Sequence, residues 1–172
     1  MPEGHVTHAE KQGVHVLRYF DEVNFMLAPG IQRFVDRLID GGSISGMVFD
    51  LTCAKALDST NLGLMARINE RLLKAGAANS VIISGNEDID IVLRSMGFDQ
   101  TFDMFPSDET SAGAHRVPVA SGAPDEPIVP DPPSAIDLRK TMLEAHRALI
   151  RLSEAGRLEF ETVVQCLEHE RP

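Results

Sequence analysis

The segment FDLTCAKALDSTNLGLMARINE, residues 49–70, contains the transition that decides the fold. It begins inside SGMVFDL, residues 45–51, a short apolar run typical of a strand covered on both faces. Its second half is the beginning of a longer run, LGLMARINERLLKAGA, residues 62–77. In this run, apolar residues recur at helical spacing until Gly76. The four polar residues 58–61 therefore lie where a buried strand is followed by a helix.

The same alternation continues on both sides of this segment. Upstream, the pattern predicts a strand at 13–20 and an amphipathic helix at 27–42. Downstream, it predicts a buried strand at 80–85, a helix capped by Asn86 and ending at Gly97, and a last strand at 101–105. Strands that alternate with helices over short connections are typical of an α/β fold. We expect a sheet of about four to five mostly parallel strands.

The composition divides the chain into three parts. Residues 1–105 carry the α/β pattern, and residues 106–134 are rich in Pro, Ser, Ala and acids, which predicts an extended or disordered acidic linker. Residues 135–172 predict a hairpin of two amphipathic helices with a break at Gly156. Because two such helices cannot bury their apolar faces alone, they must dock on the α/β domain, pair with another copy, or hold a partner.

Charge and composition exclude several kinds of partner. The net charge is −10, and the basic residues are scattered among acids, which disfavours nucleic acid and an acidic membrane surface. No segment resembles a signal peptide or approaches the roughly 18 to 20 apolar residues that span a bilayer, so we expect a cytoplasmic protein.

No metal or cofactor site is predicted. Cys53 and Cys166 are far apart and belong to no C-x-x-C pair, so we expect buried free thiols. His5 and His8 lie on a polar, mobile amino terminus and supply too few ligands for a metal ion.

The polar residues before the second helix have two interpretations. Asp58 or Ser59 can cap the helix by accepting hydrogen bonds from its first amides. A helix amino terminus also carries about half a positive charge and tolerates a phosphate, so Ser59 is a candidate phosphoacceptor. Phosphorylation would add roughly 1.5 to 2 negative charges beside Asp58 and change the surface that a partner meets.

The usual signatures of catalysis do not occur. Ser59 lacks the G-x-S-x-G context of a hydrolase nucleophile, and no glycine-rich phosphate-binding loop is found. VIISGN, residues 81–86, ends without the lysine of a receiver domain. We therefore predict that the protein is not an enzyme.

Most of residues 10–105 resembles the STAS domain of bacterial anti-sigma factor antagonists. The likeness lies in the order of elements, in residues 49–70, and in VIISGNEDIDIVLRSMGFDQTFDMF. The family hallmark D-S-[ST]-G-L-[GA] is matched by residues 58–63, with Asn61 where the family usually has Gly. The resemblance implies a STAS-like sheet and leaves the helical extension outside the minimal domain.

The resemblance also implies a function. In the family, the unmodified domain binds an anti-sigma factor, often a Ser kinase of the histidine-kinase-like ATPase type, and phosphorylation weakens the complex. Ser59 would be the acceptor, Thr60 a second possible acceptor, and Asp58 the acid that shapes the kinase contact. A PP2C-like phosphatase would restore the unmodified state.

The predicted partner-binding surface comprises the turn at Asp58, Ser59, Thr60 and Asn61, the loop around Asn24, and Arg67 and Arg71. For the two arginines, a solvated helix face is the alternative interpretation. For the whole protein, the alternative function is a phosphorylation-independent STAS scaffold or protein-binding module that acts through the helical tail. The tail is also a candidate for homodimer formation.

Overall fold

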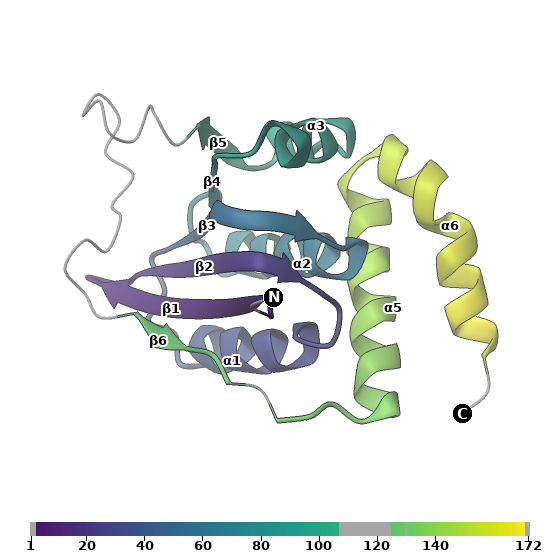
Figure 1. Ribbon diagram of the computed structural model, residues 1–172, viewed down its shortest axis with the longest axis horizontal. Coiled ribbons are helices and arrows are strands. Elements are labelled where there is room, and N and C mark those ends of the chain that lie inside the picture. The colour runs from purple at the N-terminus through teal and green to yellow at the C-terminus, as the bar shows by residue number, and fades with distance from the viewer. Residues whose placement is uncertain (1–2, 107–124, 130, 171–172) are drawn as a thin grey trace.

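The computed structural model describes residues 3–106, 125–129 and 131–170, which form one mixed sheet with helices packed against it (Figure 1). The strands are β1 (His5–Lys11), β2 (Val14–Val23), β3 (Gly46–Leu57), β4 (Val81–Ser84), β5 (Asp103–Pro106) and β6 (Glu126–Pro127). The helices are α1 (Ala28–Asp40), α2 (Ser59–Lys74), α3 (Glu87–Ser95), α5 (Ala135–Leu152) and α6 (Glu154–His169), with a 3-10 turn η1 (Phe98–Gln100).

The strand order is β5-β4-β3-β2-β1-β6, and the four strands from β2 to β5 run parallel. The predicted α/β fold with a mostly parallel sheet is therefore confirmed. The described residues contain six strands rather than four or five, because β1 and β6 add an antiparallel edge beside β2.

The expectation of a mobile amino terminus was wrong. β1 forms a hairpin with β2 through Gln12 and Gly13, which both have positive φ, 54° and 82°. Such a two-residue turn matches the twist of the paired strands. Val6 and Ala9 of β1 are buried, so this strand contributes to the core.

Part of the predicted linker is structured. β6 lies within it and pairs with β1 at the edge of the sheet. Pro127 is tolerated there because no further strand needs a hydrogen bond from its backbone nitrogen. Residues 107–124 of the predicted linker lie outside the described residues. The division at 105 and 134 stays a prediction.

The core follows the alternation of side chains along the strands. Phe49 of β3 is fully buried, and its ring lies 6.5 Å from that of Tyr19 and 6.2 Å from that of Phe102. These residues belong to the main cluster, which also contains buried residues of α1 and α2. A smaller cluster on the other face of the sheet contains Ala9, Val16, Val48 and Ile83.

Two expectations about burial were wrong. Cys53 and Cys166 are both exposed free thiols. Cys53 lies on the part of β3 beyond the last residue paired with β4, and Cys166 lies outside the face of α6 that buries Val164 and Leu167. Met26, on the loop before α1, is 44% exposed.

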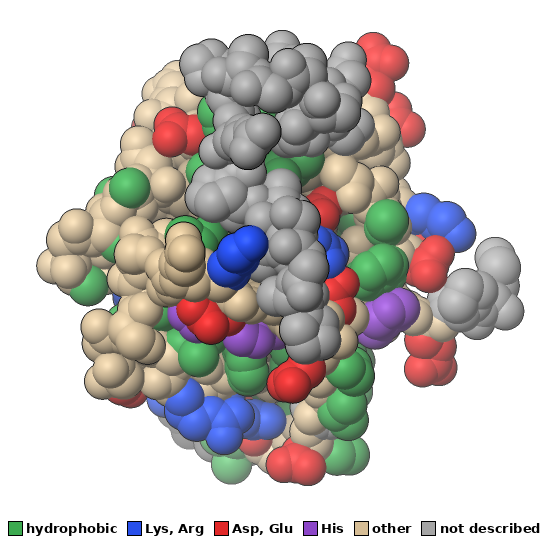
Figure 2. All heavy atoms as spheres, turned by 90° about the vertical axis from the view of Figure 1, so that its left-hand side faces the viewer, with side chains coloured by type: hydrophobic (Ala, Val, Ile, Leu, Met, Phe, Trp, Pro, Cys, Tyr) green, Lys and Arg blue, Asp and Glu red, His purple; other side chains and the backbone are tan. Residues whose placement is uncertain are grey.

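The charged side chains on the face in Figure 2 occur in small groups of both signs. The described residues on this face form no continuous basic surface of the kind that nucleic acid requires. Among the described helices, none has the length and apolarity needed to cross a membrane.

Two histidines form a polar pair on the β1–β2 hairpin. His8 Nε2 lies 2.9 Å from His15 Nδ1, their rings stack, and the His8 ring meets Phe34 of α1 edge-on. Burial lowers the pKa of both side chains, and His15 lowers the pKa of His8 further, against the opposing effect of Glu10. Asp125 and Glu126 also raise the pKa of His8.

The pair predicts a loss of stability in mild acid. Because both pKa values are lowered in the folded state, the unfolded chain binds more protons below its histidine pKa of about 6.5. Stability is complete above that pH and falls below it. We expect a lower urea midpoint at pH 5.5 than at pH 7.5, and a smaller difference in His8→Gln. An equal difference in the variant would contradict the assignment.

Candidate functional site

The hallmark turn forms the amino terminus of α2. Asp58 has extended backbone angles and caps the helix: its Oδ1 accepts a 2.9 Å hydrogen bond from the amide of Asn61. The capping role predicted for Asp58 is confirmed. Ser59 is the first residue of the helix, so it is not the cap.

Asn61 fixes this turn to the end of the neighbouring strand. Its side chain is fully buried, and Nδ2 donates to Asp58 Oδ1 at 2.9 Å and to the Val23 carbonyl at 3.4 Å. Asn61 is not among the positive-φ residues of the described chain, so this position does not require a glycine conformation. The side chain connects the Ser59 turn to the loop that contains Asn24.

Ser59 is partly buried because a residue from the carboxy-terminal part of the chain contacts it. Its Oγ lies 2.9 Å from Nε2 of His146 on α5, although the two residues are 87 positions apart in the sequence. His146 Nδ1 donates to the Met142 carbonyl at 2.6 Å, so in the neutral ring Nε2 accepts the proton of the serine hydroxyl. His146 is 3% exposed, and its ring meets Phe160 of α6 edge-on.

Helices α5 and α6, which we call the α5–α6 hairpin, dock on the α/β domain through α2 (Figure 1). At the crossing, Gly63 lies against Ala145, and a Cβ added to Gly63 would lie 2.2 Å from the Ala145 carbonyl oxygen. Ala66 of α2 and Ala148 of α5 are also buried. Small side chains allow the two backbones to approach closely, so α2 is covered on the side that faces away from the sheet.

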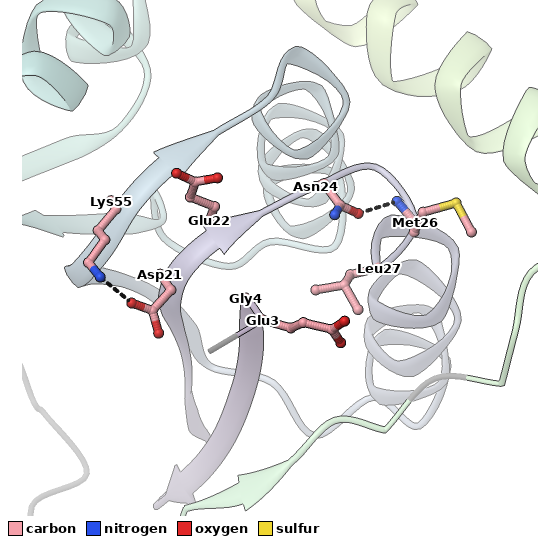
Figure 3. A pocket seen from close by; sticks show the side chains of 8 residues that line it. All are labelled: Glu3, Gly4, Asp21, Glu22, Asn24, Met26, Leu27 and Lys55. Atoms are coloured by element: carbon pink, nitrogen blue, oxygen red, sulfur yellow. Dashed lines mark hydrogen bonds and ion pairs between the residues drawn. The ribbon is translucent and has the colours of Figure 1, made fainter. Parts of the chain in front are cut away.

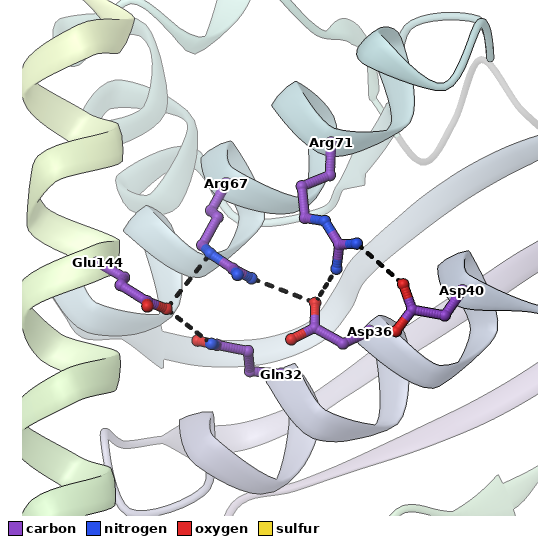
Figure 4. Close-up of polar contacts among 6 residues, drawn as sticks. All are labelled: Gln32, Asp36, Asp40, Arg67, Arg71 and Glu144. Carbon is purple, nitrogen blue, oxygen red and sulfur yellow. Dashed lines mark hydrogen bonds and ion pairs between the residues drawn. The ribbon is translucent and has the colours of Figure 1, made fainter.

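The predicted partner-binding arginines form ion pairs within the chain (Figure 4). Arg67 pairs with Asp36 of α1 at 3.3 Å and with Glu144 of α5 at 3.5 Å. Arg71 pairs with Asp36 and, at 3.2 Å, with Asp40. These pairs connect α1, α2 and α5, so the two arginines do not lie on a freely solvated helix face. A role for Arg67 and Arg71 in partner binding stays a prediction.

The loop around Asn24 presents apolar side chains to solvent. Asn24 Oδ1 accepts a 3.0 Å hydrogen bond from the Met26 amide, which shapes the turn before α1, and Phe25 and Met26 are 42% and 44% exposed. A 540 Å³ hollow adjoins this loop (Figure 3). An ion pair of 2.8 Å between Lys55 and Asp21 lies on its rim.

The structure brings together part of the predicted site. The turn at residues 58–61 and the Asn24 loop adjoin each other through the Asn61–Val23 hydrogen bond. Arg67 and Arg71 lie further along α2, toward α1. Sequence reasoning missed His146, because no local pattern connects a histidine on a distant helix with Ser59. No group of three or more His, Cys, Asp or Glu side chains in the described part of the chain is arranged to hold a metal ion.

Comparison with solved structures shows the same fold in anti-sigma factor antagonists. The antagonist from Mycobacterium paratuberculosis is 21% identical, with a TM-score of 0.54 over 66% of this chain and 95% of that protein. Unphosphorylated SpoIIAA, also an anti-sigma factor antagonist, is 16% identical, with a TM-score of 0.52 over 62% and 91%. The phosphorylated form of Bacillus SpoIIAA is 14% identical, with a TM-score of 0.51 over 63% and 99%.

Sequence comparison identifies the family. None of the curated proteins compared with this chain matches significantly. The family model of the STAS domain matches residues 5–111, which is more than half of the chain and includes strands β1 to β5, α1, α2 and the Ser59 turn. The protein therefore belongs to the STAS-domain family and has the fold of the anti-sigma factor antagonists.

Proposed function

We propose that this protein is an anti-sigma factor antagonist that acts by partner switching in the cytoplasm. In its unmodified state it binds an anti-sigma factor, a Ser kinase of the histidine-kinase-like ATPase type, and phosphorylation of Ser59 weakens that complex. A PP2C-like phosphatase restores the unmodified state. The observation that carries the proposal is the position of Ser59, the first residue of α2, with the cap supplied by its neighbour Asp58.

The local structure favours Ser59 as the phosphoacceptor. Because the Asp58 carboxylate caps α2, a phosphate on Ser59 leaves the cap in place, and the positive end of the helix dipole stabilises the added negative charge. Thr60 is the weaker candidate, since its side chain is buried at 3% exposure.

The adjoining loop supplies an apolar surface for a partner. Phe25 and Met26 are exposed next to Asn24, and large apolar side chains of this kind are enriched in the centres of protein interfaces. A doubly charged group at the edge of such a surface opposes desolvation of the interface. The exposed apolar surface therefore accounts for binding of the partner, and the charge of a phosphate on Ser59 accounts for its release.

The Ser59–His146 pair does not favour an enzyme. In many enzymes, a nucleophilic hydroxyl is hydrogen-bonded to a histidine base, and a third group orients the histidine. Ser59, His146 and the Met142 carbonyl have this arrangement. Here the His146 side chain is almost completely buried between α2 and Phe160 of α6, so a substrate cannot approach the base. We infer a binding protein that catalyses no reaction.

The test compares two variants of Ser59. The partner is first identified by cross-linking and affinity capture with the wild-type chain, and its dissociation constant is then measured by titration calorimetry. Ser59→Ala is expected to bind with the wild-type affinity, and Ser59→Asp at least tenfold more weakly. Ser43→Asp, which places the same charge on an exposed residue before β3, is the matched control and should bind normally. Equal affinities of the two Ser59 variants would exclude the switch.

A second candidate function is phosphorylation-independent binding through the helical tail. It is favoured by Ile136 of α5 and Leu158 of α6, which are 73% and 70% exposed. In that case Ile136→Ser or Leu158→Ser, and neither Ser59 variant, would lower the affinity for the partner. Such a result would replace the proposed switch with a scaffold that uses the tail.

A further inference from the structure

We propose that the α5–α6 hairpin controls access to Ser59, because the docked hairpin and a phosphate on Ser59 exclude one another. The hairpin must leave α2 before a kinase reaches the hydroxyl, and phosphorylation then holds the hairpin detached. The inference rests on the proposed role of Ser59 as the acceptor, and it adds the regulation of that site by the chain's own carboxy-terminal helices.

The first argument is the contact at the hydroxyl itself. The Ser59 Oγ donates to Nε2 of His146 over 2.9 Å, and Nδ1 of the same ring is already bonded to the Met142 carbonyl. A phosphoryl group replaces the donated proton with acceptor oxygens, so acceptors would then face the acceptor Nε2. The Asp58 carboxylate next to Ser59 adds a repulsive charge. With a neutral His146 ring, the present hydrogen bond is lost on phosphorylation.

The second argument is that His146 has no room to turn away. Its ring is 3% exposed and lies between α2 and Phe160 of α6, with ring centroids 5.2 Å apart. A densely packed side chain cannot move without its neighbours. Space for a phosphate therefore requires displacement of the helix that carries the histidine.

The third argument is that α5 cannot shift slightly and remain docked. The Ala145 backbone already lies so close to Gly63 that even a methyl group on the glycine would overlap it. Tightly packed helix contacts switch between arrangements rather than deform continuously. Displacement at His146 therefore separates α5 from α2 as a unit, together with α6.

Polar contacts also join the hairpin to the α/β domain: Glu144 contacts Arg67 and Gln32, and Ser153 donates to the Met96 carbonyl. Arg151 forms a bidentate pair with Glu70, at 3.0 and 2.9 Å, but Arg151 is exposed, and exposed ion pairs contribute little. Both helices also lie outside the part of the chain that matches the STAS domain. Of the buried residues of the main core cluster, all but Ala148 and Leu149 lie in the α/β domain, so most of that core remains when the hairpin leaves.

The experiment measures the distance between the two native cysteines. Cys53 on β3 and Cys166 on α6 are both exposed and are the only cysteines of the chain, so a pair of spin labels reports hairpin docking without further mutation. The unmodified chain and a chain with phosphoserine incorporated at position 59 are compared by double electron–electron resonance. We expect one narrow distance for the unmodified chain and a broad, longer distribution for the phosphorylated chain.

Hydrogen exchange provides a second readout. The amides of residues 135–152 are expected to exchange at least tenfold faster in the chain phosphorylated at Ser59, while those of β3 keep their protection. Ser59→Ala, which adds no charge, should stay docked, and phosphoserine at Ser43 is the control for charge elsewhere. If the distance between the labels stays the same or narrows, and the amide exchange rates of α5 stay the same, the proposal is overturned. A phosphate held by a protonated His146 would give that result.

The two proposals can fail separately. If phosphorylated Ser59 releases the hairpin but leaves the affinity for the anti-sigma factor unchanged, the control by the hairpin stands and the partner switch is wrong. If it weakens the complex while the hairpin stays docked, the switch stands and the control by the hairpin is overturned.

Discussion

Replacement of Gly63 by alanine is expected to detach the α5–α6 hairpin while the sheet stays folded. The added Cβ would lie 2.2 Å from the Ala145 carbonyl oxygen and 2.9 Å from its Cα, so the two backbones cannot keep their contact. Overpacking typically costs about 1–3 kcal/mol, and more where backbone must move. Alanine is also a better helix former than glycine by about 0.8–1 kcal/mol, so α2 itself is not weakened.

Hydrogen exchange distinguishes detachment from unfolding. In Gly63→Ala, the amides of α5 should lose protection by about a hundredfold, while those of β3 and β4 retain theirs. Gly46→Ala is the matched control, since the nearest atom to its added Cβ is 3.9 Å away on Val14. Full protection of α5 in Gly63→Ala would contradict the close crossing of α2 and α5.

Replacement of Phe49 by alanine is expected to destabilise the whole molecule rather than one part of it. Phe49 lies fully buried on the central strand β3, between the rings of Tyr19 and Phe102. Truncation of a buried phenylalanine costs about 3–5 kcal/mol. Because small domains are stable by only about 5–15 kcal/mol, this loss is a large part of the total.

Urea unfolding at neutral pH measures the effect. The free energy of unfolding should fall by about 3–5 kcal/mol in Phe49→Ala, with sheet and hairpin lost together. Phe25→Ala removes the same side chain from an exposed position and should change stability by less than about 0.5 kcal/mol. If the two variants lose equal stability, Phe49 is not the centre of the core.

Helix α5 shows where sequence reasoning reached its limit. Leu138, Met142, Ala145, Leu149 and Leu152 recur at helical spacing, and the segment that contains them forms α5. The residues that the structure buries most are Thr141, Ala145, His146, Ala148 and Leu149. A close crossing with α2 buries small and polar side chains, whereas the hydrophobic pattern emphasises large ones.

The sequence by itself determined the features that depend on neighbours along the chain. The parallel β3–α2–β4 region follows from the period of apolar residues, and the caps Asp58 and Asn86 follow from the need of first-turn amides for acceptors. Only the tertiary structure decided that α5 covers α2, that His146 contacts Ser59, and that β1 and β6 form the edge of the sheet. The physical reason is that an apolar face must be covered, but its composition does not specify which distant segment covers it.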